Sequence, residues 1–166
     1  MKHVYVCLLA VGLSAAGTLQ AAQNKPAAAA AKPAATATAK ARTVELIGDE
    51  KMKFDKDEIV AKPGETIRLV LKAVGTMPKA IMAHNFVLLQ PTADVAEFNK
   101  AAFNARPTDF IPPDKKSDII AATALAGGGE TVEVTFKVPA KAGSYNYLCS
   151  FPGHFAMGMR GKLIVK

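Results

Sequence analysis

The sequence predicts an all-β domain, a sandwich or barrel of antiparallel strands, over residues 42–166. Short segments in which apolar and polar residues alternate recur through this region, and clusters of turn residues separate them. Apolar residues make up 50% of the chain, which is enough for one hydrophobic core. The segments expected to form strands are residues 43–47, 52–54, 58–60, 66–71, 81–90, 119–123, 130–138, 143–148 and 160–165.

One segment, residues 92–106, departs from the strand pattern. Its apolar residues at helical spacing are Val95, Phe98, Ala102 and Phe103. We therefore expect one short helix that packs on the sandwich by this face. Thr92 or Asp94 can cap the first turn, because either side chain can accept a backbone N–H. Three prolines follow and are expected to prevent regular structure there, namely Pro107, Pro112 and Pro113.

The N-terminal residues have the layout of a secretory signal peptide. Residues 1–3 are short and basic, an apolar run occupies residues 4–16, and small residues continue to Ala22. The apolar run is too short to serve as a permanent membrane anchor. We therefore expect a signal peptide over residues 1–21, a periplasmic location, and a mature chain without a transmembrane segment.

Residues 22–41 are rich in alanine, proline and lysine and have almost no residue that could join a core. Pro26 and Pro33 interrupt any helix before it can pass the costly nucleation stage. We expect a linker that holds the folded domain away from whatever the N-terminus meets. A dispensable tail is the alternative.

The charge of the chain does not indicate a nucleic-acid partner. Lysine and arginine number 21 against 14 acidic residues, but the basic residues are scattered or lie in the linker. There is no run of four or more basic residues of the kind that binds nucleic acid. We expect no nucleic-acid partner, and the possibility of an acidic redox partner stays open.

Removal of the signal peptide would leave one cysteine and two histidines. The chain has two cysteines and three histidines, and Cys7 and His3 lie in the expected signal peptide. The remaining cysteine, Cys149, could not form an internal disulfide in an oxidising compartment. It would then be buried and inert, paired with another chain, or a metal ligand.

Three donor residues, Cys149, His154 and Met159, occupy one loop between two expected strands. The Ser-Phe-Pro-Gly turn after Cys149 would bring His154 back near the sulfur. The one other imidazole expected in the mature chain belongs to His84, at the beginning of the strand predicted at residues 81–90. A thiolate, two imidazoles and a thioether form the ligand set of a mononuclear copper electron-transfer site.

These residues resemble the azurin-like cupredoxins, which are type 1 blue copper proteins. The resemblance rests on the runs at residues 77–88 and 147–154 and on the position of the helical insert. It implies a Greek-key β-sandwich of about eight strands with one short helix in the insert. It also implies one copper ion, held equatorially by His84, Cys149 and His154, with a methionine on the axis and a weak contact from the Ala83 carbonyl.

The axial methionine could be Met157 or Met159. Met159 immediately precedes the last expected strand and so has a defined direction, whereas Met157 lies in the turn. Four residues separate His154 from Met159, a spacing similar to that of auracyanin or plastocyanin. We therefore expect Met159 to be the axial ligand and Met157 to be a packing or surface residue.

The surroundings of the site carry further expectations. The backbone N–H groups of Asn85 and Phe151 are candidates to hydrogen-bond the thiolate, and the Asn85 side chain should tie its strand to the Cys149 loop. An apolar patch of Met82, Phe155 and Met157, with Ala156, could surround the exposed edge of His154 and dock redox partners. Scattered apolar surface residues are the alternative.

We expect an exported, monomeric single-electron carrier that is not an enzyme. A periplasmic copper carrier or storage protein would use the same ligands, but a closed site with one thiolate favours retention of the ion. A nucleophilic cysteine would need an oriented third group beside Cys149 and His154. A copper oxidase or reductase would need a second metal centre, for which two histidines are too few.

Overall fold

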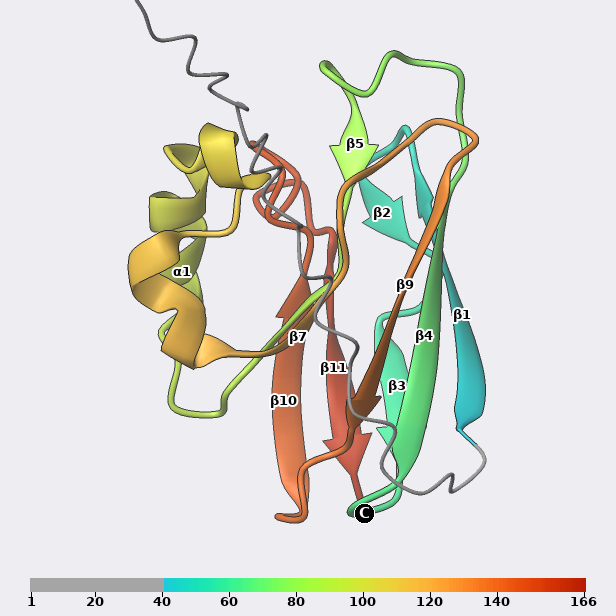
Figure 1. The fold of residues 1–166 in the computed structure, drawn as a ribbon, viewed down its shortest axis with the longest axis vertical. Helices are drawn as coiled ribbons and strands as arrows, with labels where there is room; N and C mark the ends of the chain where they lie inside the picture. Colours follow the sequence, from blue (N-terminus) through green and yellow to red (C-terminus); the bar gives the residue numbers. More distant parts are fainter. Residues whose placement is uncertain (1–40) are drawn as a thin grey trace, which may run out of the picture. The chain divides into compact units, whose positions relative to one another are not determined.

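A computed structural model describes residues 41–166, and most of its strands form two facing sheets (Figure 1). The expected signal peptide and nearly all of the expected linker, residues 1–40, lie outside the described residues and stay predictions. The strands are β1 (Arg42–Asp49), β2 (Lys53–Phe54), β3 (Glu58–Ala61), β4 (Thr66–Ala73), β5 (Ala83–His84), β6 (Val87–Leu89), β7 (Ile119–Ala122), β8 (Ala126–Gly127), β9 (Thr131–Lys137), β10 (Gly143–Leu148) and β11 (Arg160–Val165).

The sheets are mixed, which corrects the expectation of purely antiparallel pairing. One sheet has the order β2-β1-β4-β9, the other has the order β3-β11-β10-β6-β7, and β5 pairs with β8. The pairs β1–β4 and β3–β11 are parallel, and the other pairs are antiparallel. Alternation of apolar residues identifies the buried face of a strand but not the direction of its neighbour. The sequence pattern therefore could not distinguish parallel from antiparallel pairs.

The all-β fold class is confirmed, although the described residues contain 11 strands rather than about eight. Some of the additional strands are very short, and the segment predicted at residues 81–90 divides into β5 and β6. Between them, the backbone N–H of Phe86 donates to Thr123 Oγ1 at 3.0 Å, and Thr123 N–H donates to the Phe86 carbonyl at 3.0 Å. These two bonds replace ladder pairing at the break.

The main core lies between the two sheets and follows from the alternating pattern. On β4, the side chains of Ile67, Leu69 and Leu71 are fully buried. They belong to the same apolar cluster as Leu88 and Leu163 of the opposite sheet. Each such aliphatic side chain contributes about 1.5–3 kcal/mol by leaving water, so this layer supplies much of the driving force for folding.

The helix α1 (Val95–Phe103) confirms the expected insert and covers the outer face of the five-stranded sheet. Asp94 caps it, because its carboxylate accepts the N–H groups of the next turn at 2.9 and 3.0 Å. Phe98 and Ala102 are buried in the cluster formed with the sheet. Phe103 is 62% exposed, so its expected packing is wrong. It lies about 140° around the helix from Phe98 and therefore faces solvent.

The proline-rich segment after α1 is also more regular than expected. Two 3₁₀-helices occupy Arg106–Thr108 and Pro113–Asp118. A proline near the start of each causes no loss, because the first N–H groups of a helix have no partner within it. Within residues 41–166, no helix combines the length and the apolar character needed to cross a bilayer.

Candidate metal centre

Two segments far apart in the sequence meet at one end of the sandwich. His84 lies on β5, which the pairing of His84 with Ala126 of β8 holds in place. Cys149 directly follows β10, and His154 lies on the loop that leads to β11. Backbone hydrogen bonds close this loop: Cys149 N–H donates to the Met159 carbonyl at 3.0 Å, and Met159 N–H donates to the His154 carbonyl at 2.9 Å.

The donor atoms of His84, Cys149 and His154 converge. His154 Nδ1 lies 3.3 Å from His84 Nδ1 and 3.4 Å from Cys149 Sγ, and the three ligand atoms all lie within 4.8 Å of one another. Two ligands of one first-row metal ion, each about 2.0–2.3 Å from it, lie about 3.3–3.8 Å apart in trigonal or tetrahedral geometry. The donor set is therefore spaced to share one ion, and its sulfur and imidazoles suit copper.

Met159, unlike Met157, is buried next to this donor cluster. Met159 is fully buried in an apolar group with Cys149 and Ala83, whereas Met157 is 52% exposed. The Met159 methyl carbon also borders Gly48, where an added Cβ would lie 2.8 Å from it and 3.1 Å from the His84 ring. The residue expected from the sequence to be the axial ligand, Met159, is therefore buried in the same cluster as Cys149.

The Ala83 carbonyl faces the sulfur side of the same cluster. Its oxygen lies 4.0 Å from Cys149 Sγ, and the Ala83 residue is fully buried. Alanine at this position thus leaves the carbonyl directed toward the donors. This direction of the Ala83 carbonyl is compatible with the weak contact to copper that is expected from the sequence.

Burial leaves the apoprotein site without formal charge near neutral pH. Burial raises the pKa of the Cys149 thiol to about 12, although backbone N–H groups of Asn85 and Phe151 act in the opposite direction. Burial, and then the neighbouring His84, lower the pKa of His154 to about 4. Burial also lowers the pKa of His84. Neutral imidazoles are ready to bind a metal, and the thiol would release its proton on binding.

The backbone N–H groups of Asn85 and Phe151 act to lower the pKa of the Cys149 thiol, the effect expected if they donate hydrogen bonds to its sulfur. Those two hydrogen bonds stay a prediction. The Asn85 side chain is bonded to Ser150, so it ties the His84 strand to the Cys149 loop as expected. These contacts fix the sulfur and one imidazole relative to each other.

Sequence reasoning missed two residues that shape the site, Gly48 and Phe110. Gly48 directly follows the strand expected at residues 43–47, and it leaves the space that the Met159 methyl group and the His84 ring occupy. Phe151 packs on the His154 ring with centroids 4.8 Å apart, and Phe110 packs edge-on against Phe151 at 5.0 Å. Gly48 and Asp49 follow an alternating strand, and this pattern is a sequence signal for a turn at Gly48. The proline-rich segment that contains Phe110 carries no comparable signal for that residue.

The surface beside the site differs in one respect from the expectation. Met82 and Phe155 are half-buried and Met157 is exposed, but His154 is only 2% exposed. The His154 imidazole therefore has almost no exposed edge, contrary to the expectation. Its ring packs against the Phe151 ring, which explains why so little of it is exposed to solvent.

Comparisons with known proteins agree with this geometry. The family model described as copper binding proteins, plastocyanin/azurin family, matches residues 41–166. Auracyanin-A of Chloroflexus aurantiacus is 41% identical over 117 residues, which cover 70% of this chain and 68% of that protein. Azurin-1 of Alcaligenes xylosoxydans xylosoxydans is 38% identical over 124 residues, which cover 73% and 95%.

A solved structure matches the fold as well. The crystal structure of dithionite-reduced auracyanin from Roseiflexus castenholzii is 37% identical, with a TM-score of 0.66 over 75% of this chain and 96% of that chain. The resemblance to the cupredoxins and the expectation of copper as the cofactor are thereby confirmed. The chain belongs to the plastocyanin/azurin family of copper-binding proteins.

Proposed function

We propose that the chain is an exported type 1 copper protein that carries single electrons between redox partners. The observation that carries this proposal is the convergence of one thiol and two imidazoles within 4.8 Å, all in buried residues. A site of this kind is closed to solvent and contains a soft sulfur donor, which suits both oxidation states of copper.

In this proposal His84, Cys149 and His154 would hold the copper ion, Met159 would be its weak fourth ligand and the Ala83 carbonyl would add a weak contact. Copper held there would supply the chemistry, which is the gain and loss of one electron. The burial of Met159 beside Cys149 supports its assignment over the exposed methionine two residues earlier.

The task of the protein residues is to keep the donor geometry unchanged when the charge of the site changes. The Asn85–Ser150 hydrogen bonds and the packed Phe151 ring restrain the donors. A restrained site reorganises little, and small reorganisation permits fast electron transfer. This argument supports electron transfer over delivery of the ion, which would require an opening site.

We further propose that the protein is not an enzyme. The His84 and His154 residues are each 2% exposed and Cys149 is fully buried, which leaves no room for a substrate at the donors. Electrons would then leave through the surface of the 149–159 loop. Met82, Phe155 and Met157 form the proposed docking patch for redox partners.

Export and a monomeric state complete the proposal. Export to the periplasm is supported by the signal-peptide layout of residues 1–21, followed by the linker at residues 22–41. The proposal also includes the monomeric state expected from the sequence.

The test is repeated redox cycling of the copper-loaded protein at an electrode, with copper content measured after each cycle. The proposal predicts a reversible one-electron wave, a constant midpoint potential and full retention of copper. Loss of copper on reduction would contradict it and would support the carrier or storage function. Turnover of nitrite or oxygen by the loaded protein with Cys149 intact would support an enzyme.

A further inference from the structure

A lysine from outside the 149–159 loop lies on the proposed docking patch. The ammonium group of Lys53, on β2, donates a hydrogen bond to the backbone carbonyl of Met157. It also packs against Gly158, where an added Cβ would lie 2.6 Å from Lys53 Nζ. The absence of a side chain at Gly158 thus leaves the space in which this cation is held.

A second cation lies on another residue of the patch. The Arg160 guanidinium carbon is 4.9 Å from the centre of the Phe155 ring, within the range of a cation–π interaction. In residues 41–166, the ion pairs join other residues, and no carboxylate lies within 4.0 Å of the charged group of Lys53 or Arg160. Both positive charges are therefore available to a partner.

Acidic residues also occur at this end of the sandwich, but two of them accept hydrogen bonds from backbone N–H groups. The Asp49 carboxylate accepts the N–H groups of Lys51 and Lys53, each at 3.1 Å. One oxygen of Glu50 accepts the N–H groups of Thr76 and Met77 at 2.7 and 2.9 Å. These carboxylates lower the local surplus of positive charge without pairing with the Lys53 ammonium.

Two further acids, Asp57 and Glu58, line a groove of about 580 Å³ together with Phe155 and Arg160. Glu58 pairs with Lys162 of β11, and the Asp57 carbonyl accepts the Lys162 N–H at 2.8 Å, so both acids lie beside a residue two positions beyond Arg160 along the strand. In this groove the two acids therefore lie beside Lys162, whereas Arg160 lies against the Phe155 ring of the patch.

We propose that the redox partner of this protein is acidic, with carboxylates around an apolar contact that seats on the Met82, Phe155 and Met157 patch. The carboxylates would lie over Lys53 and Arg160. This inference rests on the proposed function of the patch and adds the charge of the partner. Complementary charge steers encounter and fixes orientation, while the apolar centre excludes water.

The same cations argue against other occupants. Two copies of the chain joined through this patch would bring like charges together, which is unfavourable in a contact with little solvent. An anionic membrane surface would attract the lysine and arginine, but it offers no redox centre to exchange electrons with the site. A second copy and a membrane are therefore outcomes of the test.

Two forms of one cytochrome serve as probes: a basic ferric cytochrome c, and the same cytochrome made acidic by succinylation of its lysines. One electron passes from the reduced copper protein to the ferric haem, which gives oxidised copper protein and ferrous haem. The second-order rate constant is measured by stopped flow at low and at high salt, and the midpoint potential of each variant is measured separately.

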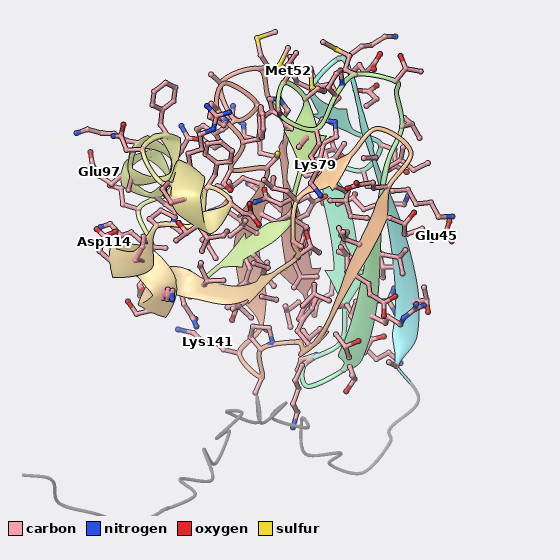
Figure 2. The ribbon with its side chains drawn as sticks, turned by 45° about the horizontal axis from the view of Figure 1, so that its top comes forward. Glu45, Met52, Lys79, Glu97, Asp114 and Lys141 are labelled. Atoms are coloured by element: carbon pink, nitrogen blue, oxygen red, sulfur yellow. The ribbon has the colours of Figure 1, made fainter. Side chains whose placement is uncertain are left out.

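The variants are Lys53→Gln and Arg160→Gln, with Lys53→Arg and Arg160→Lys to retain the charge. At low salt, each charge removal should slow electron transfer to the acidic cytochrome by about threefold and accelerate transfer to the basic one. The charge-retaining variants should match the parent protein. Lys141→Gln is the matched control, because Figure 2 shows Lys141 at the end of the sandwich opposite to Met52.

Equal rate changes with both cytochromes, or an effect of Lys141→Gln as large as that of Lys53→Gln, would overturn the inference while leaving electron transfer itself intact. Absence of electron transfer to either cytochrome would instead contradict the proposed function. Dimerisation, or binding to anionic phospholipid vesicles, that disappears in Lys53→Gln while the cytochrome rates stay unchanged would assign the patch to those occupants and also overturn the inference.

Discussion

The Asn85 side chain makes two hydrogen bonds to Ser150. Asn85 Nδ2 donates to Ser150 Oγ at 2.8 Å, and Asn85 Oδ1 accepts the Ser150 backbone N–H at 2.8 Å. Both residues are buried, at 0% and 1% exposure. Since Asn85 follows His84 and Ser150 follows Cys149, this pair holds the β5 donor and the loop donor at a fixed separation.

Asn85→Ala should lower the free energy of unfolding of the apoprotein by about 1–3 kcal/mol, because it leaves a buried Ser150 N–H without a partner. Denaturant unfolding measures the change. Ser150→Ala removes only the bond to the hydroxyl and keeps the backbone bond, so it should cost less. Equal stability of Asn85→Ala and the parent protein would contradict the role of this pair.

Met159→Leu should retain copper but shift the midpoint potential, because it removes the thioether of a residue buried in the same cluster as Cys149. Met157→Leu should leave the potential nearly unchanged, because that side chain is 52% exposed. Voltammetry of the two variants under one set of conditions compares them. If Met157→Leu shifts the potential and Met159→Leu does not, the axial assignment is wrong.

Gly48→Ala should disturb the site without breaking the fold. The new Cβ would lie 2.8 Å from the Met159 methyl carbon and 3.1 Å from the His84 ring, so both side chains must move. The midpoint potential and the visible spectrum of the copper form measure the effect. Gly64→Ala is the control: Gly64 has a φ of +72° and its nearest side-chain atom is 3.8 Å away, on Lys137.

Gly64→Ala should lower the free energy of unfolding through backbone strain and leave the visible spectrum of the copper form unchanged. An unchanged spectrum and potential in Gly48→Ala would show that the site has more freedom than these contacts indicate. A changed spectrum in Gly64→Ala would show that general destabilisation, rather than the local contact, perturbs the donors.

Tyr147 should make the fold sensitive to alkaline pH. Its hydroxyl donates to the Lys56 carbonyl at 2.7 Å, and burial first, then the nearby acids Asp57, Asp55 and Glu58, raise the pKa of this phenol. Unfolding returns that pKa to about 10. The stabilisation is therefore fully present below about pH 10 and is lost as the pH rises toward the folded-state pKa.

The apoprotein should lose about 1.4 kcal/mol of stability from Tyr147 for each pH unit above the ordinary tyrosine pKa. Tyr147→Phe should remove this contribution to the pH dependence. Urea unfolding of both proteins between neutral and alkaline pH provides the comparison. Parallel pH profiles for the two proteins would contradict the prediction.

The loop donors could be predicted because their geometry is local. Cys149, His154 and Met159 lie on one short loop, so their convergence needs no knowledge of distant packing. His84 could be predicted as the second imidazole ligand by elimination, because the expected mature chain contains only the two histidines His84 and His154. The alternating strands and the helix with Phe98 at its centre followed from side-chain periodicity.

Features that depend on distant contacts could not be predicted. The parallel pairing of β1 with β4 and of β3 with β11 depends on chain path, which alternation does not encode. Gly48 matters because two side chains from other segments approach it, and Phe110 matters because it packs on Phe151. Neither relationship leaves a periodic signal in the sequence.

The most direct test of the central claim is the visible and electron paramagnetic resonance spectrum of the oxidised, copper-loaded protein, compared with that of Cys149→Ser. We predict an intense visible thiolate-to-copper band and a type 1 resonance spectrum in the parent protein, with the band lost in Cys149→Ser. A weakly absorbing parent protein, or an intense band that persists without the Cys149 sulfur, would contradict the assignment of a blue copper site to these residues.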